Sequence, residues 1–251
     1  MSHSELASLR GEPSYVWRAG QERRLNLIAK HVRLDNAHIL DAGCGVGMYT
    51  GQFTRRYSPH VVGIEYEFER AQEAVHTTPQ VVVAANEHLP YPSNTFDTVL
   101  SHETLEHVSD DRLSAREIVR VLKLGGRAVI FVPNRCYFFE THGHYWRGAY
   151  HFGNTPFINY LPDPLRDRLA PHVRAYTRRS LLKLFRDQPV HVVAHLRIYG
   201  GFDNLIARMG RAGLMLRRFW QGIEGTPLDS FGLSHVLVIE KYPAATEIPL
   251  G

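Results

Sequence analysis

The chain has 251 residues, of which 44% are hydrophobic and 22% charged, an ordinary balance for a globular protein with a sizeable core. The formal net charge of +4 is only mildly basic and says nothing about the fold. There is no run of about 20 apolar residues, which excludes a membrane-spanning helix, and the polar start MSHSELASLRGEP shows no secretory signal. Two cysteines, Cys44 and Cys136, make no disulfide framework, so a reducing, cytoplasmic location is expected.

The hydrophobic pattern predicts alternating helices and strands along most of the chain. We expect a loose tail over residues 1–13, one domain over residues 14–251, and a first helix over Tyr15–Leu34. The segment His38–Thr50 predicts a buried strand, a glycine-rich turn and the start of a helix. Further strands are expected at Val61–Tyr66, Val81–Asn86, Phe96–Glu103, Gly126–Asn134, His191–Gly200 and Ser234–Lys241. Further helices are expected at Glu67–His76, Asp110–Leu122, Thr177–Asp187 and Asp203–Trp220. The pair Gly125-Gly126 is expected to end the second of these helices, and Thr177 or Ser180 is expected near the N-cap of the third.

Strands that alternate with helices predict an α/β fold. The expected architecture is a seven-stranded, mostly parallel sheet with helices on both faces. Residues 135–176 depart from the alternation after the fifth strand and are rich in aromatic residues, histidine and proline. They are expected to form an inserted cap of short helices and loops.

Glycines dominate the turn after the first strand. Asp41, Gly43, Gly45 and Gly47 form a D-x-G-x-G-x-G run, and glycine is needed where φ is positive or where the backbone must touch a ligand. A dinucleotide site would require G-x-G-x-x-G, so the spacing argues against NAD or FAD. The alternative is a tight turn without a ligand.

Four motifs in order carry a family resemblance. They are the glycine run, the acidic strand end Glu65 about 20 residues beyond it, the segment AANEHLPYPSNTFDTVLSHETLEHVSD, and VLKLGGRAVIFVPN. Together they resemble the class I S-adenosylmethionine (SAM)-dependent methyltransferases of the type 11, ubiquinone-biosynthesis-like group. The resemblance implies a Rossmann-like fold and SAM as cofactor. The residues that it places at the cofactor are Asp41, Gly43, Gly45, Gly47, Glu65, Asn86, Glu87 and Ser101.

Two of these cofactor assignments rest on particular chemistry. A carboxylate at Glu65 can accept both hydrogen bonds of a ribose diol, although it could also be a merely exposed strand end. Relatives often carry an aspartate for the adenine amino group where this chain has Ala85, so Asn86 or Glu87 is expected to make that contact.

Histidines are the candidates for proton removal from the methyl acceptor. His102 and His107 lie near the end of the fourth predicted strand, and His142 and His144 lie in the cap. Histidine titrates in the useful pH range. The alternative for His107 is a packed polar residue at a helix start.

The run Glu103-x-x-Glu106-His107 suggests a metal site. Spacings of three and four would place these side chains on one helical face, where they could hold Mg²⁺ or Mn²⁺. Similar runs occur in ubiquinone-biosynthesis O-methyltransferases and small-RNA 2′-O-methyltransferases. A fourth ligand would come from His142, His144 or His151. Acidic residues also favour helix starts without any metal.

The acceptor is expected to be a small molecule bound by the aromatic cap. O-methylation of a lipid-linked, quinone-like or glycosyl substrate is the favoured function. The helix at Asp203–Trp220 is read as an interior helix with solvated arginines, or as a basic amphipathic helix on a membrane surface. A nucleic-acid methyltransferase is the runner-up, against which no long basic run is visible, and a non-catalytic SAM-binding protein is the third. The oligomeric state is left open.

Overall fold

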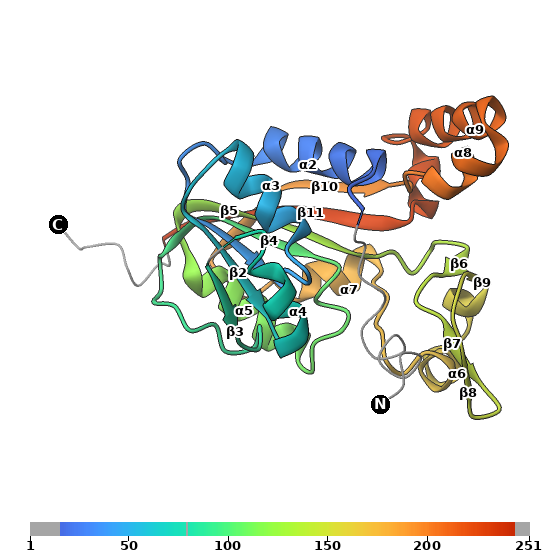
Figure 1. The fold of residues 1–251 in the computed structure, drawn as a ribbon. Coiled ribbons are helices and arrows are strands. Elements are labelled where there is room, and N and C mark those ends of the chain that lie inside the picture. Colours follow the sequence, from blue (N-terminus) through green and yellow to red (C-terminus); the bar gives the residue numbers. More distant parts are fainter. Residues whose placement is uncertain (1–15, 79, 244–251) are drawn as a thin grey trace.

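Seven strands form one central sheet in the computed structural model, which describes residues 16–78 and 80–243 (Figure 1). The expected tail over residues 1–13 lies outside the described residues. The strands are β1 (Ile39–Ala42), β2 (Val61–Glu65), β3 (Val81–Val83), β4 (Phe96–His102), β5 (Leu122–Pro133), β10 (Val190–Ile198) and β11 (Ser234–Lys241), in the order β10-β11-β5-β4-β1-β2-β3. Strands β3, β2, β1, β4 and β5 run parallel, and β11 is antiparallel to both β5 and β10. The predicted α/β fold with a mostly parallel sheet is confirmed.

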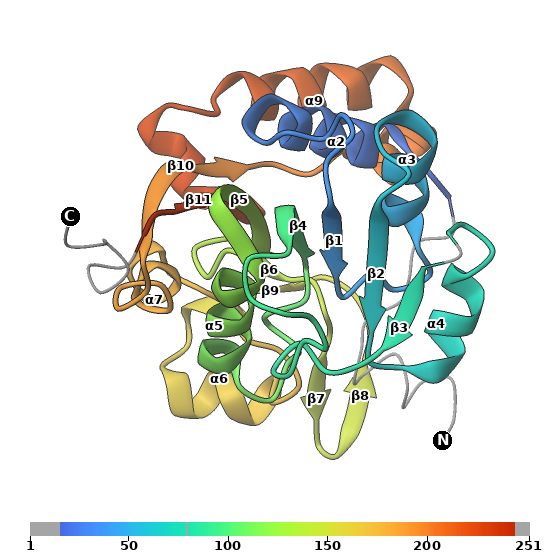
Figure 2. The ribbon, with the colours of Figure 1, turned by 90° about the vertical axis from the view of Figure 1, so that its left-hand side faces the viewer.

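Helices cover both faces of the sheet. They are α2 (Ala19–His31), α3 (Met48–Arg56), α4 (Phe68–Ala74), α5 (Asp111–Val121) and α7 (Arg178–Lys183). One buried core joins Leu25 and Phe53 of α2 and α3 to the sheet. The other joins Ile118 and Leu181 of α5 and α7 to its opposite face. Figure 2 shows α2 and α3 on one side of the sheet and α5 on the other.

Two element boundaries differ from the sequence prediction for identifiable reasons. Helix α5 ends at Val121 and passes directly into β5, so the expectation that Gly125-Gly126 ends it is wrong. The β4–β5 pairing skips from Phe96↔Leu122 to Thr98↔Arg127, and Gly125 has a φ of +74° inside this irregularity. The glycine pair therefore forms a bulge within a strand, a use of glycine that competes with helix termination. Strand β3 is also shorter than expected and stops at Val83.

Helix α7 is shorter than predicted, but its expected N-cap is confirmed. The Thr177 hydroxyl accepts a hydrogen bond from the Ser180 N–H, and the Ser180 hydroxyl accepts one from the Thr177 N–H. This reciprocal capping fixes the point where the chain re-enters the main domain after the cap.

The single helix predicted at Asp203–Trp220 is two helices. Gly210 separates α8 (Asp203–Met209) from α9 (Arg211–Gly222) with φ +53° and ψ −121°, a conformation that glycine reaches readily. The interpretation as an interior helix is wrong, because α8 buries no residue and α9 buries only Gly213. Among the described residues no helix combines the length and apolar character needed to cross a bilayer.

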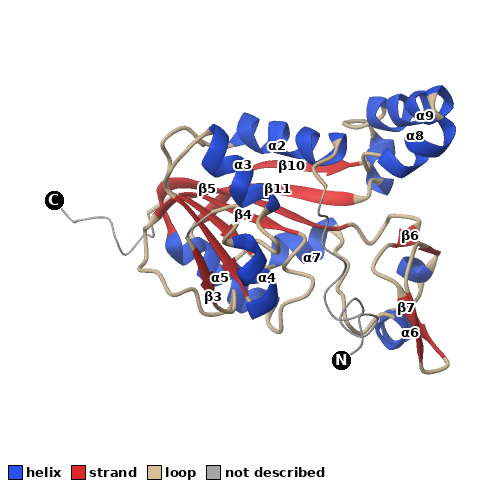
Figure 3. Cartoon of the chain, viewed as in Figure 1, coloured by secondary structure: helices blue, strands red, loops and turns tan. Residues whose placement is uncertain are grey.

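The cap contains strands that were not predicted (Figure 3). It consists of β6 (Phe139–Glu140) paired with β9 (Thr155–Pro156), β7 (His144–Trp146) paired with β8 (Ala149–His151), a 3₁₀ turn at Ile158–Tyr160, and α6 (Asp163–Leu169). Arg147 and Gly148 both have positive φ, +49° and +83°, as the two-residue turn of a β-hairpin requires. The R-G pair was the sequence signal for this hairpin.

The cap enters and leaves the main domain at one place. An isolated parallel bridge joins Asn134 to Tyr176. The Arg135 N–H donates to the Tyr176 carbonyl, and the Tyr176 N–H donates to the Pro133 carbonyl, each at 2.9 Å. The two connections are thus held side by side at the end of β5.

Candidate active site

A cleft of about 1220 Å³ lies at the carboxyl ends of the central parallel strands. Residues at or just after the ends of β1, β2 and β4 line it, including Gly45, Glu65 and Glu103. The cap contributes His142 and Phe152 to the opposite wall. Typical small-molecule pockets measure roughly 300–1,000 Å³, so the cleft has room for two small molecules. Its place agrees with the general rule for ligand sites in open α/β sheets.

The three glycines of the turn have different surroundings. All have positive φ, at +87° for Gly43, +56° for Gly45 and +80° for Gly47. A Cβ on Gly43 would collide with the Thr104 side chain, and one on Gly47 would collide with Thr77. A Cβ on Gly45 would meet no atom within 4 Å, and Gly45 lines the cleft whereas Gly47 does not. Of these three glycines, Gly45 therefore combines a place in the cleft lining with open space in its Cβ direction, where a ligand can approach the backbone.

Glu65 is joined directly to this turn. One carboxylate oxygen accepts the Gly45 N–H at 2.8 Å, and the other accepts the Glu67 N–H at 3.0 Å. Each oxygen has further lone pairs, so the side chain can still accept from a ligand's hydroxyl groups. Asp41, also in the cleft wall, accepts the Thr50 hydroxyl at 2.6 Å, and burial raises the pKa of Asp41 to about 6.

Two of the other predicted cofactor residues line the cleft and one does not. Asn86 lines the cleft, and its buried Oδ1 accepts no hydrogen bond from the described residues. Glu87 also lines it, but its Oε1 already accepts the N–H groups of Ser109 and Asp110 just before α5. Ser101 is 1% exposed within β4 and does not line the cleft. Asn86 is therefore the better placed of these residues for the adenine amino group.

His102 is held neutral at the end of β4. Its Nε2 lies 3.0 Å from Nη1 of Arg24, and since guanidinium only donates, the ring nitrogen accepts. Burial and the neighbouring Arg24 charge lower the pKa of His102 to about 3. An effective general base has a pKa near the working pH, so His102 is poorly suited to proton removal. Arg24 lines the cleft from α2 and carried no sequence signal beyond the helical pattern.

The E-x-x-E-H run lies in a turn rather than on a helix. Helix α5 begins only at Asp111, so the predicted shared helical face is wrong. Glu103 has a φ of +52°, and its Oε1 accepts the Ser234 hydroxyl at 2.9 Å and lies 4.0 Å from Nη2 of Arg24. Burial raises the pKa of Glu103, but Arg24, the two neighbouring histidines His102 and His142 and the Ser234 hydrogen bond together lower it below its usual value. Ser234, on β11, was not predicted to be a residue of the site.

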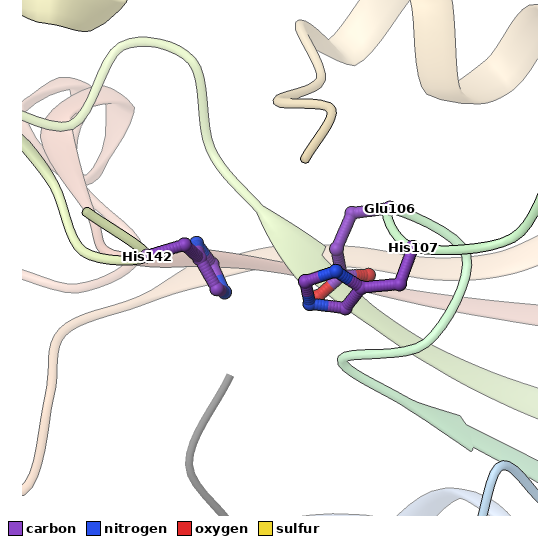
Figure 4. A group of neighbouring side chains, drawn as sticks. All are labelled: Glu106, His107 and His142. Atoms are coloured by element: carbon purple, nitrogen blue, oxygen red, sulfur yellow. The ribbon is translucent and has the colours of Figure 1, made fainter. Parts of the chain in front are cut away.

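Glu106 and His107 come together with His142 from the cap. One ligand atom from each of the three side chains lies within 4.8 Å of the others (Figure 4). Burial and the adjacent Glu103 carboxylate raise the pKa of Glu106 well above its usual range, and burial lowers the pKa of His107 to about 3. Of the predicted metal ligands, Glu103 stands outside this group, whereas His142, one of the three candidates for a fourth ligand, belongs to it.

His144 belongs to a separate contact in the cap hairpin. Its Nδ1 lies 2.9 Å from the Thr155 hydroxyl, and its ring stacks on His151 at 5.3 Å between centroids. His144 does not line the cleft. The structure thus gathers His102, His107 and His142 at the cleft and leaves His144 aside.

Sequence comparison places the glycine turn and both acidic motifs in one known domain. The family described as methyltransferase domain matches residues 40–130. An O-methyltransferase, cnsE, from Penicillium expansum is 34% identical over 39% of this chain and 40% of that protein. The 2-methyl-6-phytyl-1,4-hydroquinone methyltransferase of Synechocystis sp. is 33% identical over 37% of this chain and 30% of that protein. The match therefore spans less than half of these relatives.

Solved structures extend the likeness to nearly the whole chain. A SAM-dependent methyltransferase from Mesorhizobium loti superposes with a TM-score of 0.63 at 18% identity, over 89% of this chain and 98% of that one. A geranyl diphosphate C-methyltransferase from Streptomyces coelicolor, solved with Mg²⁺, geranyl diphosphate and S-adenosyl-L-homocysteine, has a TM-score of 0.59 at 16% identity, over 89% of this chain and 79% of that one. Residues 40–130 therefore match a methyltransferase domain, and the chain has the class I fold seen in SAM-dependent methyltransferases.

Proposed function

We propose that this chain transfers a methyl group from SAM to an oxygen atom of a small-molecule acceptor. The observation that carries the proposal is the bare backbone of Gly45, which opens on the cleft and is hydrogen-bonded to Glu65. Asn86, in the same wall, offers an unpartnered buried carbonyl oxygen. A hydroxyl-bearing ribose at Glu65 and an adenine amino group at Asn86 would meet these two groups.

The residues around the cleft would mainly align the reactants. When bound, SAM would supply a methyl group carried on a positively charged sulfur. An acceptor oxygen would attack the methyl carbon in line with the C–S bond, whose electron pair leaves on sulfur. Holding the acceptor in that line is the largest contribution that such a site makes. His142 lines the cleft, and Glu140 holds its ring through Nδ1, 3.1 Å from Oε1. This leaves Nε2 as the nitrogen that can serve an acceptor, directly or through an ion.

An acceptor with a long apolar part fits the features beside the cleft. Phe152 lines the cap wall, and several large aromatic side chains of the cap are exposed: Phe139, Trp146, Phe157 and Tyr160. The Synechocystis relative is named for a phytyl-hydroquinone, and the Streptomyces structure contains geranyl diphosphate. These names support a lipid-linked or quinone-like acceptor.

A labelling experiment tests the activity. With methyl-labelled SAM and separate hydroquinone, polyprenyl, glycosyl and RNA acceptors, the label should enter one of the small molecules. Calorimetry should also detect binding of SAM and of S-adenosylhomocysteine. Label in RNA would favour the nucleic-acid alternative, and absence of heat with either nucleoside would contradict a methyltransferase altogether.

We also propose that the helices α8 and α9 contact an anionic membrane surface. The α8–α9 surface is defined by its exposed side chains Met209, Met215, Leu216 and Phe219 together with Arg208, Arg211 and Arg218. Apolar side chains interleaved with arginines suit the headgroup region of an anionic bilayer. Figure 1 shows α8 and α9 at the same end of the molecule as the cap. A lipid-linked acceptor would thus be reached beside the cleft.

Vesicle sedimentation checks this membrane contact. The chain should sediment with vesicles containing phosphatidylglycerol, less with pure phosphatidylcholine, and less at high salt. Phe219→Glu should reduce binding because it places a carboxylate in the apolar part of the surface. Leu124→Glu, at an exposed apolar side chain on β5, should not. Equal loss by both variants would contradict the assignment.

A further inference from the structure

Three side chains from two parts of the chain point into one small volume. Glu106 and His107 come from the turn after β4, and His142 reaches them from the cap (Figure 4). Their ligand atoms lie within 4.8 Å of one another. Atoms that share a metal ion at about 2.0–2.2 Å lie up to about 4.4 Å apart. Movements of a few tenths of an ångström would therefore complete a binding site.

Glu106 and His107 carry buried polar atoms without hydrogen-bond partners among the described residues. Glu106 is 1% exposed, and neither of its carboxylate oxygens has a hydrogen-bond partner among the described residues. His107 Nδ1 is also buried and unpartnered. Burying polar atoms without partners is costly. A cation bound by Glu106 and His107 would satisfy both side chains at once.

The third side chain is already oriented as a ligand. His142 Nδ1 lies 3.1 Å from Glu140 Oε1, which also accepts the His142 backbone N–H at 3.0 Å. Arg166 donates to the other Glu140 oxygen at 3.0 Å, and both of these side chains are 2% exposed. Metal-binding histidines characteristically donate their second ring nitrogen to a carboxylate, which fixes the tautomer and leaves the other nitrogen for the ion.

We propose that Glu106, His107 and His142 bind one first-row transition-metal ion, of the Mn²⁺ or Zn²⁺ class. Two imidazoles with one carboxylate suit these ions, whereas Mg²⁺ prefers oxygen ligands. Of the two ions that the sequence analysis named, Mg²⁺ and Mn²⁺, this proposal favours Mn²⁺. His107 and His142 line the cleft, so the open coordination positions face the acceptor's place.

The metal would activate the acceptor hydroxyl, a role that rests on the proposed function. An acceptor hydroxyl bound to such an ion would be more acidic than a free one. Its proton would pass to solvent water, and its oxygen lone pair would form the bond to the methyl carbon as the C–S pair leaves on sulfur. The acceptors favoured by this arrangement are phenols, hydroquinones and other hydroxyl compounds.

Direct metal binding tests the proposal without methyl transfer. The metal-free chain is titrated with Mn²⁺, with the free ion followed by electron paramagnetic resonance, and with Zn²⁺ against a chromophoric chelator. One equivalent of each ion should bind, and excess Mg²⁺ should not displace Mn²⁺. Glu106→Gln and His142→Ala should each weaken binding at least tenfold. His144→Gln, which alters a cap histidine outside the group, should bind as the parent does.

Circular dichroism of each metal-free variant establishes that it is folded before its affinity is compared. Absence of binding by the folded parent, or unchanged affinity in Glu106→Gln and His142→Ala, would overturn the metal site. Displacement of Mn²⁺ by Mg²⁺ would overturn the ion class. Calorimetry with S-adenosylhomocysteine is run in parallel, so failure of the cofactor site is detected separately from failure of the metal site.

Discussion

Gly45→Val is expected to abolish SAM binding while the protein remains folded. The Gly45 position faces the open cleft, and a Cβ at this position would meet no protein atom within 4 Å, so the valine side chain collides with a ligand rather than with the protein. Calorimetry with S-adenosylhomocysteine should show an affinity loss of about 100-fold or more, equivalent to about 2.8 kcal/mol. The positive φ of +56° adds a backbone cost of roughly 1–3 kcal/mol to folding.

Gly125→Val is the matched control for that backbone cost. Gly125 has a φ of +74°, also has no neighbour within 4 Å of its Cβ direction, and does not line the cleft. It should lose a similar amount of stability and bind the nucleoside normally. If Gly45→Val bound as well as Gly125→Val, the cofactor would have to lie elsewhere.

Arg166→Met is expected to lower the free energy of unfolding by about 3–5 kcal/mol, the usual cost of breaking a buried ion pair from one side. Arg166 is 2% exposed and donates to Glu140 and to the Val173 carbonyl, each at 3.0 Å. Methionine fills much of the space but leaves the Glu140 carboxylate buried without its guanidinium. Urea unfolding followed by circular dichroism measures the loss.

Two further variants separate the ion pair from the general cost of altering α6. Arg168→Met changes an exposed arginine on the same helix and should be nearly neutral. Adding Glu140→Gln to Arg166→Met removes the unpaired charge and should recover part of the stability. A loss in Arg168→Met as large as that in Arg166→Met would show that the Glu140 pair is not the cause.

The main domain could be predicted from the sequence because its signals are local. Buried strands such as Val61–Glu65 are short apolar runs, and the glycine turn has a fixed spacing. The glycine turn did not reveal that side chains pack against Gly43 and Gly47 while the Cβ direction of Gly45 is open, since Thr104 and Thr77 approach only in three dimensions.

The side-chain positions around the E-x-x-E-H run could not be predicted from the sequence, because they depend on contacts between residues far apart in the chain. Glu103 accepts a hydrogen bond from Ser234, lies near Arg24 and is not a member of the group that Glu106 forms, although Ser234 and Arg24 lie far from Glu103 in sequence. His142 joins that group because Glu140 and Arg166 orient it, a chain of contacts across the cap that no periodicity records. The short cap strands were missed for a related reason, because two or three residues are too few to show alternation.

The paired entry and exit of the cap beside Asn134 and Tyr176 has an evolutionary consequence. Because both connections leave from one spot at the end of β5, the intervening segment can be lengthened, shortened or exchanged with little disturbance to the sheet. Under the proposed function, selection could then change which acceptor is methylated without altering the glycine turn and Glu65. Graft experiments between distant homologues should accordingly use this junction as their splice point.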